Sequence, residues 1–165
     1  MKLDLSPVLN GEVKELPFSF TQNVLDDEAS VYFKGLDMTV RGDIEVKGTV
    51  RDISGYCELD CTVSLPYSTH CSRCGKETEG VCECVFQRIV SSDGSRLEDD
   101  EYIVYADRQL ELDGPVYEEL SISFPSKPLC KTDCKGLCPV CGQDLNEGDC
   151  GWGHKNENDN DKATL

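Results

Sequence analysis

The chain has 165 residues, with 32 acidic and 16 basic side chains, so its formal net charge is -16. This length suits one domain with a real hydrophobic core, while the acidic balance disfavours binding to bare phosphate backbones and favours basic partners. The sequence shows neither a secretory signal nor an apolar run of about eighteen residues, so we expect a cytoplasmic protein that does not contact the membrane.

Apolar and polar residues alternate along the first part of the chain, a pattern that is typical of half-buried strands. Residues 1–33 contain two short extended stretches, Leu3–Leu5 and Leu16–Phe20, among turn-forming and acidic residues. The alternation becomes regular between residues 38 and 50. We therefore expect strands from residue 38 onward and make no firm assignment before it.

The next two apolar runs predict a β-hairpin. Residues 56–67 form its first strand and residues 81–90 its returning strand, with Cys71-Ser72-Arg73-Cys74 at the tip. Four cysteines in these strands share a face with leucine, valine or phenylalanine, and such cysteines are more often small buried hydrophobic residues than metal ligands. They are Cys57, Cys61, Cys82 and Cys84.

Beyond the hairpin the periodicity changes from that of a strand to that of a helix. Residues 91–101 are polar and acidic and predict a solvated loop, which is followed by a strand at residues 102–105. Asp113 is expected to cap a helix over residues 114–124, because apolar residues recur at helical spacing after it and Pro125 ends the pattern. The chain is therefore predicted to contain one main helix.

The remaining cysteines have the spacing of zinc ligands. In a reducing compartment, eleven cysteines predict metal ligands or free thiols rather than disulfides. Cys71-x-x-Cys74 and Cys138-x-x-Cys141 each precede a glycine, which tolerates positive φ and lets the turn close around two sulfur atoms. Two such motifs with further cysteines nearby strongly indicate a protein whose fold is stabilised by bound metal ions. The candidate ligands are Cys71, Cys74, Cys130, Cys134, Cys138, Cys141, Cys150 and His154.

Eight ligands can form two tetrahedral sites, so we expect two structural zinc ions, Zn²⁺. In the first partition Cys71, Cys74, Cys130 and Cys134 share one metal, and Cys138, Cys141, Cys150 and His154 share the other. In the second partition Cys134, Cys138, Cys141 and Cys150 share a metal, and Cys130 stays with the first pair. The cysteine spacing leaves both partitions open. With two such sites the net charge becomes about -19.

The cysteine pairs do not match a catalytic site. A thiol oxidoreductase places its first cysteine at the start of a helix, whereas neither pair here precedes an apolar helical pattern. A zinc hydrolase needs an open coordination position, and the counted ligands close both sites. We therefore expect a protein that is not an enzyme. The alternative is a redox-responsive or zinc-storing thiol protein.

The order of these motifs resembles the YceD family, the large ribosomal RNA subunit accumulation proteins of bacteria and plastids. The resemblance rests on Leu65, Cys71-Ser72-Arg73-Cys74, Leu112-Asp113, Glu118-Glu119-Leu120, Phe124-Pro125, Pro128-Leu129-Cys130, Cys134-Lys135-Gly136-Leu137-Cys138-Pro139-Val140-Cys141-Gly142, Leu145-Asn146 and Cys150. It implies a role in the accumulation of 23S ribosomal RNA or in large-subunit biogenesis.

The family pattern also bears on the metal ligands. Some relatives lack the Cys-Pro-x-Cys motif but keep ligand-type residues near Cys130 and Cys134, which favours the first partition. Many relatives end the cluster with Cys-x-Cys. Here the corresponding position is Trp152, and His154 is the expected substitute.

Together these patterns predict an α+β fold, mostly an antiparallel β meander with one main helix and a C-terminal zinc knuckle. The β-rich domain is expected to cover residues 1–136, the zinc knuckle residues 137–155 and a disordered acidic tail residues 156–165. The expected partner is a basic large-subunit ribosomal protein or a pre-ribosomal particle. Tight direct binding to naked RNA is not expected from so acidic a chain.

Overall fold

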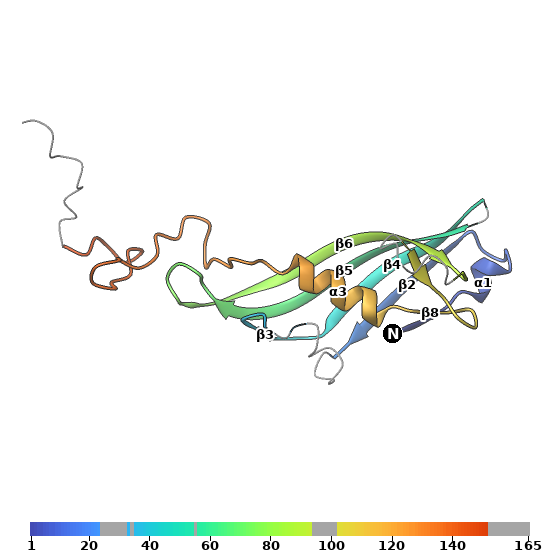
Figure 1. Ribbon diagram of the computed structural model, residues 1–165, viewed down its shortest axis with the longest axis horizontal. Helices are drawn as coiled ribbons and strands as arrows, with labels where there is room; N and C mark the ends of the chain where they lie inside the picture. Colours follow the sequence, from blue (N-terminus) through green and yellow to red (C-terminus); the bar gives the residue numbers. More distant parts are fainter. Residues whose placement is uncertain (24–32, 34, 55, 94–101, 152–165) are drawn as a thin grey trace, which may run out of the picture.

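One sheet runs along the length of the molecule in the computed structural model, which describes residues 1–23, 33, 35–54, 56–93 and 102–151 (Figure 1). Its strands are β2 (Glu15–Gln22), β3 (Met38–Val40), β4 (Ile44–Ile53), β5 (Tyr56–His70), β6 (Glu77–Ser91) and β7 (Tyr102–Val104). The order across the sheet is β2-β4-β5-β6-β7, and β3 pairs with the far part of β5.

The other elements lie outside this sheet. They are β1 (Lys2–Asp4), the short helix α1 (Ser6–Leu9), β8 (Gln109–Glu111) and the main helix α3 (Asp113–Ser123). β1 and β8 form a separate antiparallel pair. The predicted fold, mostly β and rich in antiparallel pairing with one main helix, is thus confirmed. Among the described residues, neither helix has the length and apolar character needed to cross a membrane.

The hydrophobic core lies on one face of the sheet, because apolar side chains recur at every second position along the strands. Leu59, Val63 and Leu65 of β5 are at most 1% exposed. α3 packs on this face through Val116, Tyr117 and Leu120 and crosses in front of the central strands (Figure 1). The opposite face is largely exposed, as is common for antiparallel sheets.

The four strand cysteines belong to this core, as the sequence predicts. Cys57, Cys61, Cys82 and Cys84 are all at most 7% exposed and contact the aliphatic cluster. Burial raises the pKa of the Cys61 thiol to about 12 and that of Cys84 to about 11. These side chains therefore stay protonated and behave as small hydrophobic residues.

The strand that follows residue 38 is interrupted by a bulge. Val40 lies opposite Tyr67 and Glu45 lies opposite Ser64, so residues 41–44 face only residues 65 and 66 of β5. Pro66 has no N–H to give to a ladder, and its carbonyl accepts a hydrogen bond from the backbone of Arg41 at 2.9 Å. The bulge thus separates β3 from β4 at the position where β5 contains a proline.

Three details differ from the sequence expectations. β7 runs parallel to β6 and does not extend the antiparallel meander, because the ten-residue connection is too long to enforce a hairpin. α1, which begins with a proline in its first turn, was not predicted. Asp113 does not cap α3, since Leu112 occupies the cap position and the Asp113 carboxylate instead accepts a hydrogen bond from the amino group of Met1.

Two segments with sequence predictions lie outside the described residues. They are residues 94–101, which belong to the predicted loop, and residues 152–165, which include the predicted tail.

Gly48 provides a test of how tightly the sheet and core are packed. A Cβ atom at this position would lie 2.3 Å from the carbonyl oxygen of Asp60 and 2.6 Å from the ring of Phe18. Gly48→Ala should therefore lower the free energy of unfolding by about 1–3 kcal/mol, as measured by denaturant titration.

The matched control is Gly42→Ala in the bulge. A Cβ atom there would approach no closer than 3.4 Å to Pro66, so the cost should stay below about 1 kcal/mol. Equal losses in the two variants would contradict this description of the β2–β4–β5 packing.

Candidate metal centre

The tip of the β5–β6 hairpin holds the first cysteine pair. The register of the hairpin is unbroken from Cys57 opposite Val90 to His70 opposite Glu77. Beyond it, the backbone N–H of Cys71 donates to the carbonyl of Lys76 at 2.8 Å, and that of Gly75 donates to the carbonyl of Cys71 at 2.8 Å. Gly75 has φ +71°, so the turn around the two sulfur atoms uses the conformational freedom of glycine.

The second cysteine pair repeats this turn. The N–H of Cys138 donates to the carbonyl of Gln143 at 2.8 Å, and the N–H of Gly142 donates to that of Cys138 at 2.9 Å. Gly142 has φ +75°. The two Cys-x-x-Cys-Gly motifs therefore form the same local structure, although one joins two long strands and the other lies in a region without them.

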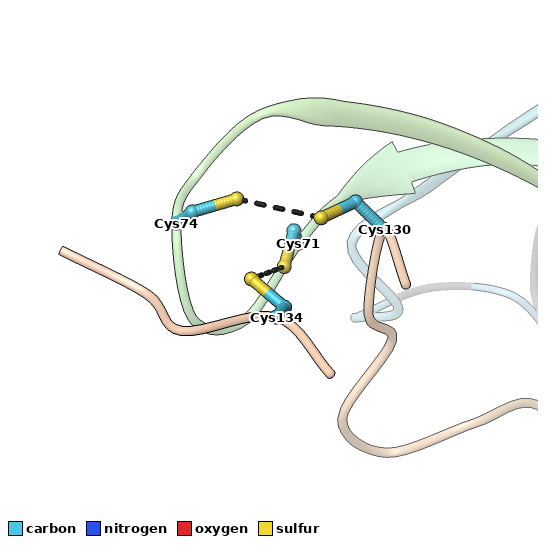
Figure 2. A group of neighbouring side chains, drawn as sticks. All are labelled: Cys71, Cys74, Cys130 and Cys134. Atoms are coloured by element: carbon cyan, nitrogen blue, oxygen red, sulfur yellow. Dashed lines mark hydrogen bonds between the residues drawn. The ribbon is translucent and has the colours of Figure 1, made fainter. Parts of the chain in front are cut away.

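The segment after α3 carries two further cysteines to the hairpin tip. The helix ends at Ser123, and the chain continues as an irregular coil toward the hairpin tip (Figure 1). The N–H of Ser72 donates to the carbonyl of Pro128 at 2.8 Å, and the guanidinium of Arg73 donates to the carbonyl of Cys134 at 2.7 Å. Figure 2 shows the result, in which thiols from the two segments point toward a common centre.

The four thiols have the spacing of a tetrahedral metal site. The sulfur atoms of Cys71, Cys74, Cys130 and Cys134 all lie within 4.8 Å of one another. The Cys71–Cys134 distance is 3.7 Å and the Cys74–Cys130 distance is 3.6 Å. Four thiolates at about 2.3 Å from Zn²⁺ would lie about 3.8 Å apart, whereas a disulfide needs about 2.05 Å. These are the four thiols that the first of the two partitions considered from the sequence assigns to one metal ion.

Electrostatics in this group favour a bound cation. Hydrogen bonds from the backbone N–H groups of Cys130, Arg73 and Cys74 lower the pKa of the Cys71 thiol to about 6. The side-chain amide of Asn146 is the main cause of a lowered pKa at Cys134. Desolvation and the neighbouring thiols raise the pKa of Cys130 to about 12, because several thiolates cannot gather without a positive charge. A divalent ion would supply that charge, so the donor set fits zinc.

Residues of the second knuckle support the first thiol group. Asn146 Nδ2 lies 3.4 Å from the sulfur of Cys134, and Asn146 Oδ1 accepts the backbone N–H of Lys135 at 2.9 Å. Lys76, beside the hairpin tip, pairs with Asp144 at 2.8 Å and with Glu147 at 2.9 Å. Hydrogen bonding to Lys76 lowers the pKa of Asp144 to about 2. The two knuckles are therefore in direct contact.

These supporting roles were not inferred from the sequence. The available signal was the Asp144-x-Asn146 spacing after the second glycine, in which the backbone N–H of Asn146 donates to the carboxylate of Asp144 at 2.8 Å. Such turns are common in loops, so the spacing alone does not identify an amide directed at a thiolate. The contact is seen only in the folded structure, where the segment that contains Asn146 lies against the segment that contains Cys134.

A second group contains three thiols. The sulfur atoms of Cys138, Cys141 and Cys150 lie within 4.8 Å of one another, and Cys141 is exposed. Backbone N–H groups of Cys141 and Val140 lower the pKa of Cys138 to about 6. His154, the predicted fourth ligand, lies outside the described residues. This group can supply three of the four ligands that a tetrahedral zinc ion requires.

Comparison with known proteins links this architecture to a family. Residues 59–165, well over half of the chain, match the family model described as large ribosomal RNA subunit accumulation protein YceD. Uncharacterized proteins of Mycobacterium bovis and Mycobacterium tuberculosis are each 30% identical over 88 residues, covering 51% of this chain and 42% of the relative. A protein of Mycobacterium leprae is 27% identical over 88 residues, covering 41% of its length. The match thus spans less than half of these relatives. No solved structure matches the chain.

The zinc content of cysteine variants tests the grouping. We expect about two zinc ions per wild-type chain, because two sets of four ligands can be assembled. Cys74→Ser should lose one ion and several kcal/mol of unfolding free energy, since structural zinc sites contribute on the order of 10 kcal/mol of binding free energy. Cys141→Ser should lose the other ion at a smaller cost to the domain. Elemental analysis and thermal unfolding measure both effects.

The control is Cys84→Ser, which alters a cysteine in the hydrophobic core. It should keep the full zinc content while losing about 1–3 kcal/mol, because it buries a hydroxyl among apolar side chains. A reduced wild-type preparation without zinc would refute the metal assignment. One ion per chain would show that the second group does not complete its coordination.

Proposed function

This chain belongs to the YceD family of large ribosomal RNA subunit accumulation proteins, and from that membership we propose that it supports the accumulation of 23S ribosomal RNA. The observation that carries the proposal is the family match over residues 59–165, which includes most of the hairpin and both cysteine groups.

We propose that zinc in this protein is structural. Cys71, Cys74, Cys130 and Cys134 would hold one ion, and their four thiolates would fill a tetrahedral coordination shell without an open position for substrate. Cys138, Cys141 and Cys150 would hold a second ion together with His154. The ions would supply positive charge among thiolates and so join the hairpin to the segment after α3. Such closed sites support a role for the protein that is not enzymatic.

The charge distribution supports action through a protein partner. The net charge of -16 opposes approach to an RNA backbone. Two basic residues near the cysteines are engaged within the molecule, Arg73 with the carbonyl of Cys134 and Lys76 with Asp144 and Glu147. We propose that this cytoplasmic protein engages a basic large-subunit ribosomal protein or a pre-ribosomal particle and thereby assists assembly.

Removal of the protein from its host should lower the amount of 23S relative to 16S ribosomal RNA, which quantitative RNA analysis measures. Complementation with the wild-type chain or with Cys84→Ser should restore the ratio. Cys74→Ser should fail, because it disrupts the thiol group that joins the hairpin to the following segment.

An unchanged ratio of 23S to 16S RNA in cells lacking the protein would contradict the proposed function. The alternative, a redox-responsive or zinc-storing protein, predicts a different result. In that case the deletion would leave ribosomal RNA intact but would make growth sensitive to oxidants or to zinc limitation.

The partner class is tested by co-purification under defined salt. Basic ribosomal proteins should remain bound after nuclease treatment and should dissociate as the ionic strength rises from about 0.1 M to about 1 M, because salt screens charge pairs between exposed surfaces. Submicromolar binding to naked 23S fragments at physiological salt, without affinity for basic ribosomal proteins, would instead indicate direct RNA recognition.

A further inference from the structure

One long edge of the main sheet has backbone groups available for pairing. β6 pairs with β5 from Glu77 to Val90, but on its other side β7 covers only Ile89 to Ser91. Within the described parts of the chain, no other strand pairs with this side of β6. The stretch from Glu77 to Arg88 is therefore an exposed strand edge of the kind that binds a further strand.

Two hydrogen bonds show which backbone groups point to the open edge. The carbonyl of Ser91 accepts the N–H of Tyr105 on the β7 side, and the carbonyl of Lys76 accepts the N–H of Cys71 on the β5 side. Backbone groups of successive strand residues point to opposite sides. The N–H and C=O groups of Glu79, Val81, Glu83, Val85 and Gln87 therefore point away from β5 and into solvent.

This edge has glutamates but lacks other common protections against pairing. Natural edges are often protected by a bulge, a proline or charged side chains, lysine above all. From residue 77 to residue 88 the register with β5 is unbroken, and the sequence contains no proline or lysine. Val81 and Val85 are 56% and 76% exposed, respectively. Two apolar side chains thus lie beside free hydrogen-bonding groups.

The charges on this edge of β6 determine which kind of strand can bind to it. Glu79 and Glu83 alternate with the two valines, and neither carboxylate has an ion pair among the described residues. Lysine or arginine opposite these glutamates would form favourable cross-strand pairs, and an apolar residue would pack against each valine. Antiparallel pairing of two copies centred on Val81 or Glu83 would place glutamate opposite glutamate, which is unfavourable.

We propose that the free edge of β6 binds an extended basic segment of a partner protein as an added strand. The segment would alternate apolar and basic side chains on one face, matching Val81, Glu83 and Val85 in turn. Backbone pairing would supply affinity, and the glutamates would supply selectivity for a basic segment. This surface would be where the partner of the proposed function docks, but the binding test below does not depend on that function.

The first test uses the full-length, zinc-loaded protein and a synthetic peptide, Thr-Val-Thr-Lys-Thr-Val-Thr-Lys-Thr. In the free protein, amides of the five outward-pointing residues should exchange with solvent faster than those of the even-numbered residues, which bond to β5. Peptide binding should slow the exchange of the outward-pointing amides by about tenfold or more. The same peptide with glutamate in place of lysine should not bind.

Three variants separate backbone pairing from general charge attraction. Glu83→Lys reverses a charge on the edge, and Val85→Pro removes an outward N–H while leaving the bonds to β5 intact. Each should weaken peptide binding by about tenfold, since a lost contact of about 1.4 kcal/mol gives that factor. Glu15→Lys, on the opposite edge strand β2, makes the same charge change and also removes the ion pair of Glu15 with Arg51, and it should leave the affinity unchanged.

Several outcomes would overturn the proposal. Equal weakening by Glu15→Lys and Glu83→Lys would show a diffuse charge effect. Full binding of the peptide to a folded Val85→Pro variant would exclude strand addition. If that variant does not fold, the wild-type complex provides the test. Unchanged exchange of the outward-pointing amides in that complex would then exclude strand addition. Concentration-dependent dimerisation that protects the same amides would assign the edge to a second copy. The 23S assay is separate, so a failed peptide test would leave the proposed function standing.

Discussion

The shape of the C-terminal part depends on the meeting of four sulfur atoms. Residues 125–151 contain no helix or extended strand, and their contacts with the hairpin tip centre on a small cluster of Cys71, Cys74, Cys134 and Leu129. So few apolar atoms cannot offset the conformational entropy of ordering such a segment. The thiol group and the turn hydrogen bonds around it therefore determine where this segment lies.

The molecule thus combines two kinds of interior. One is a hydrophobic core between the sheet and α3, in which cysteines stay protonated because burial disfavours their charge. The other is polar and consists of the two thiol groups, in which backbone N–H groups lower the pKa of Cys71 and Cys138, whereas desolvation and neighbouring thiols raise the pKa of Cys130. The lowering at Cys71 and Cys138 arises from N–H donors, whereas the pKa values of the thiols in the hydrophobic core are raised mainly by desolvation.

The sequence predicts those features that depend on local pattern. Period-two alternation identifies β4, β5 and β6 but not β8, and the Cys-x-x-Cys-Gly motif identifies two turns that the structure shows to be alike. Features that depend on distant segments were missed or wrong. Three such features each depend on a residue that is distant in the sequence. They are the direction of β7, the contact of Asn146 with Cys134 and the pairing of Asp113 with the amino group of Met1. The two cysteine partitions were undecidable from spacing for the same reason.

The turn at the hairpin tip has a consequence for folding fidelity. Because β5 and β6 pair without a bulge from residue 57 to residue 90, the pairing of Cys71 with Lys76 sets every later partner along the hairpin. A slip by one position would turn the core side chains of a whole strand toward water. A short loop closes at small entropic cost, so this end can form early and propagate the correct alignment toward the rest of the sheet. The turn that brings the thiols together thus also sets the register of the two longest strands of the protein.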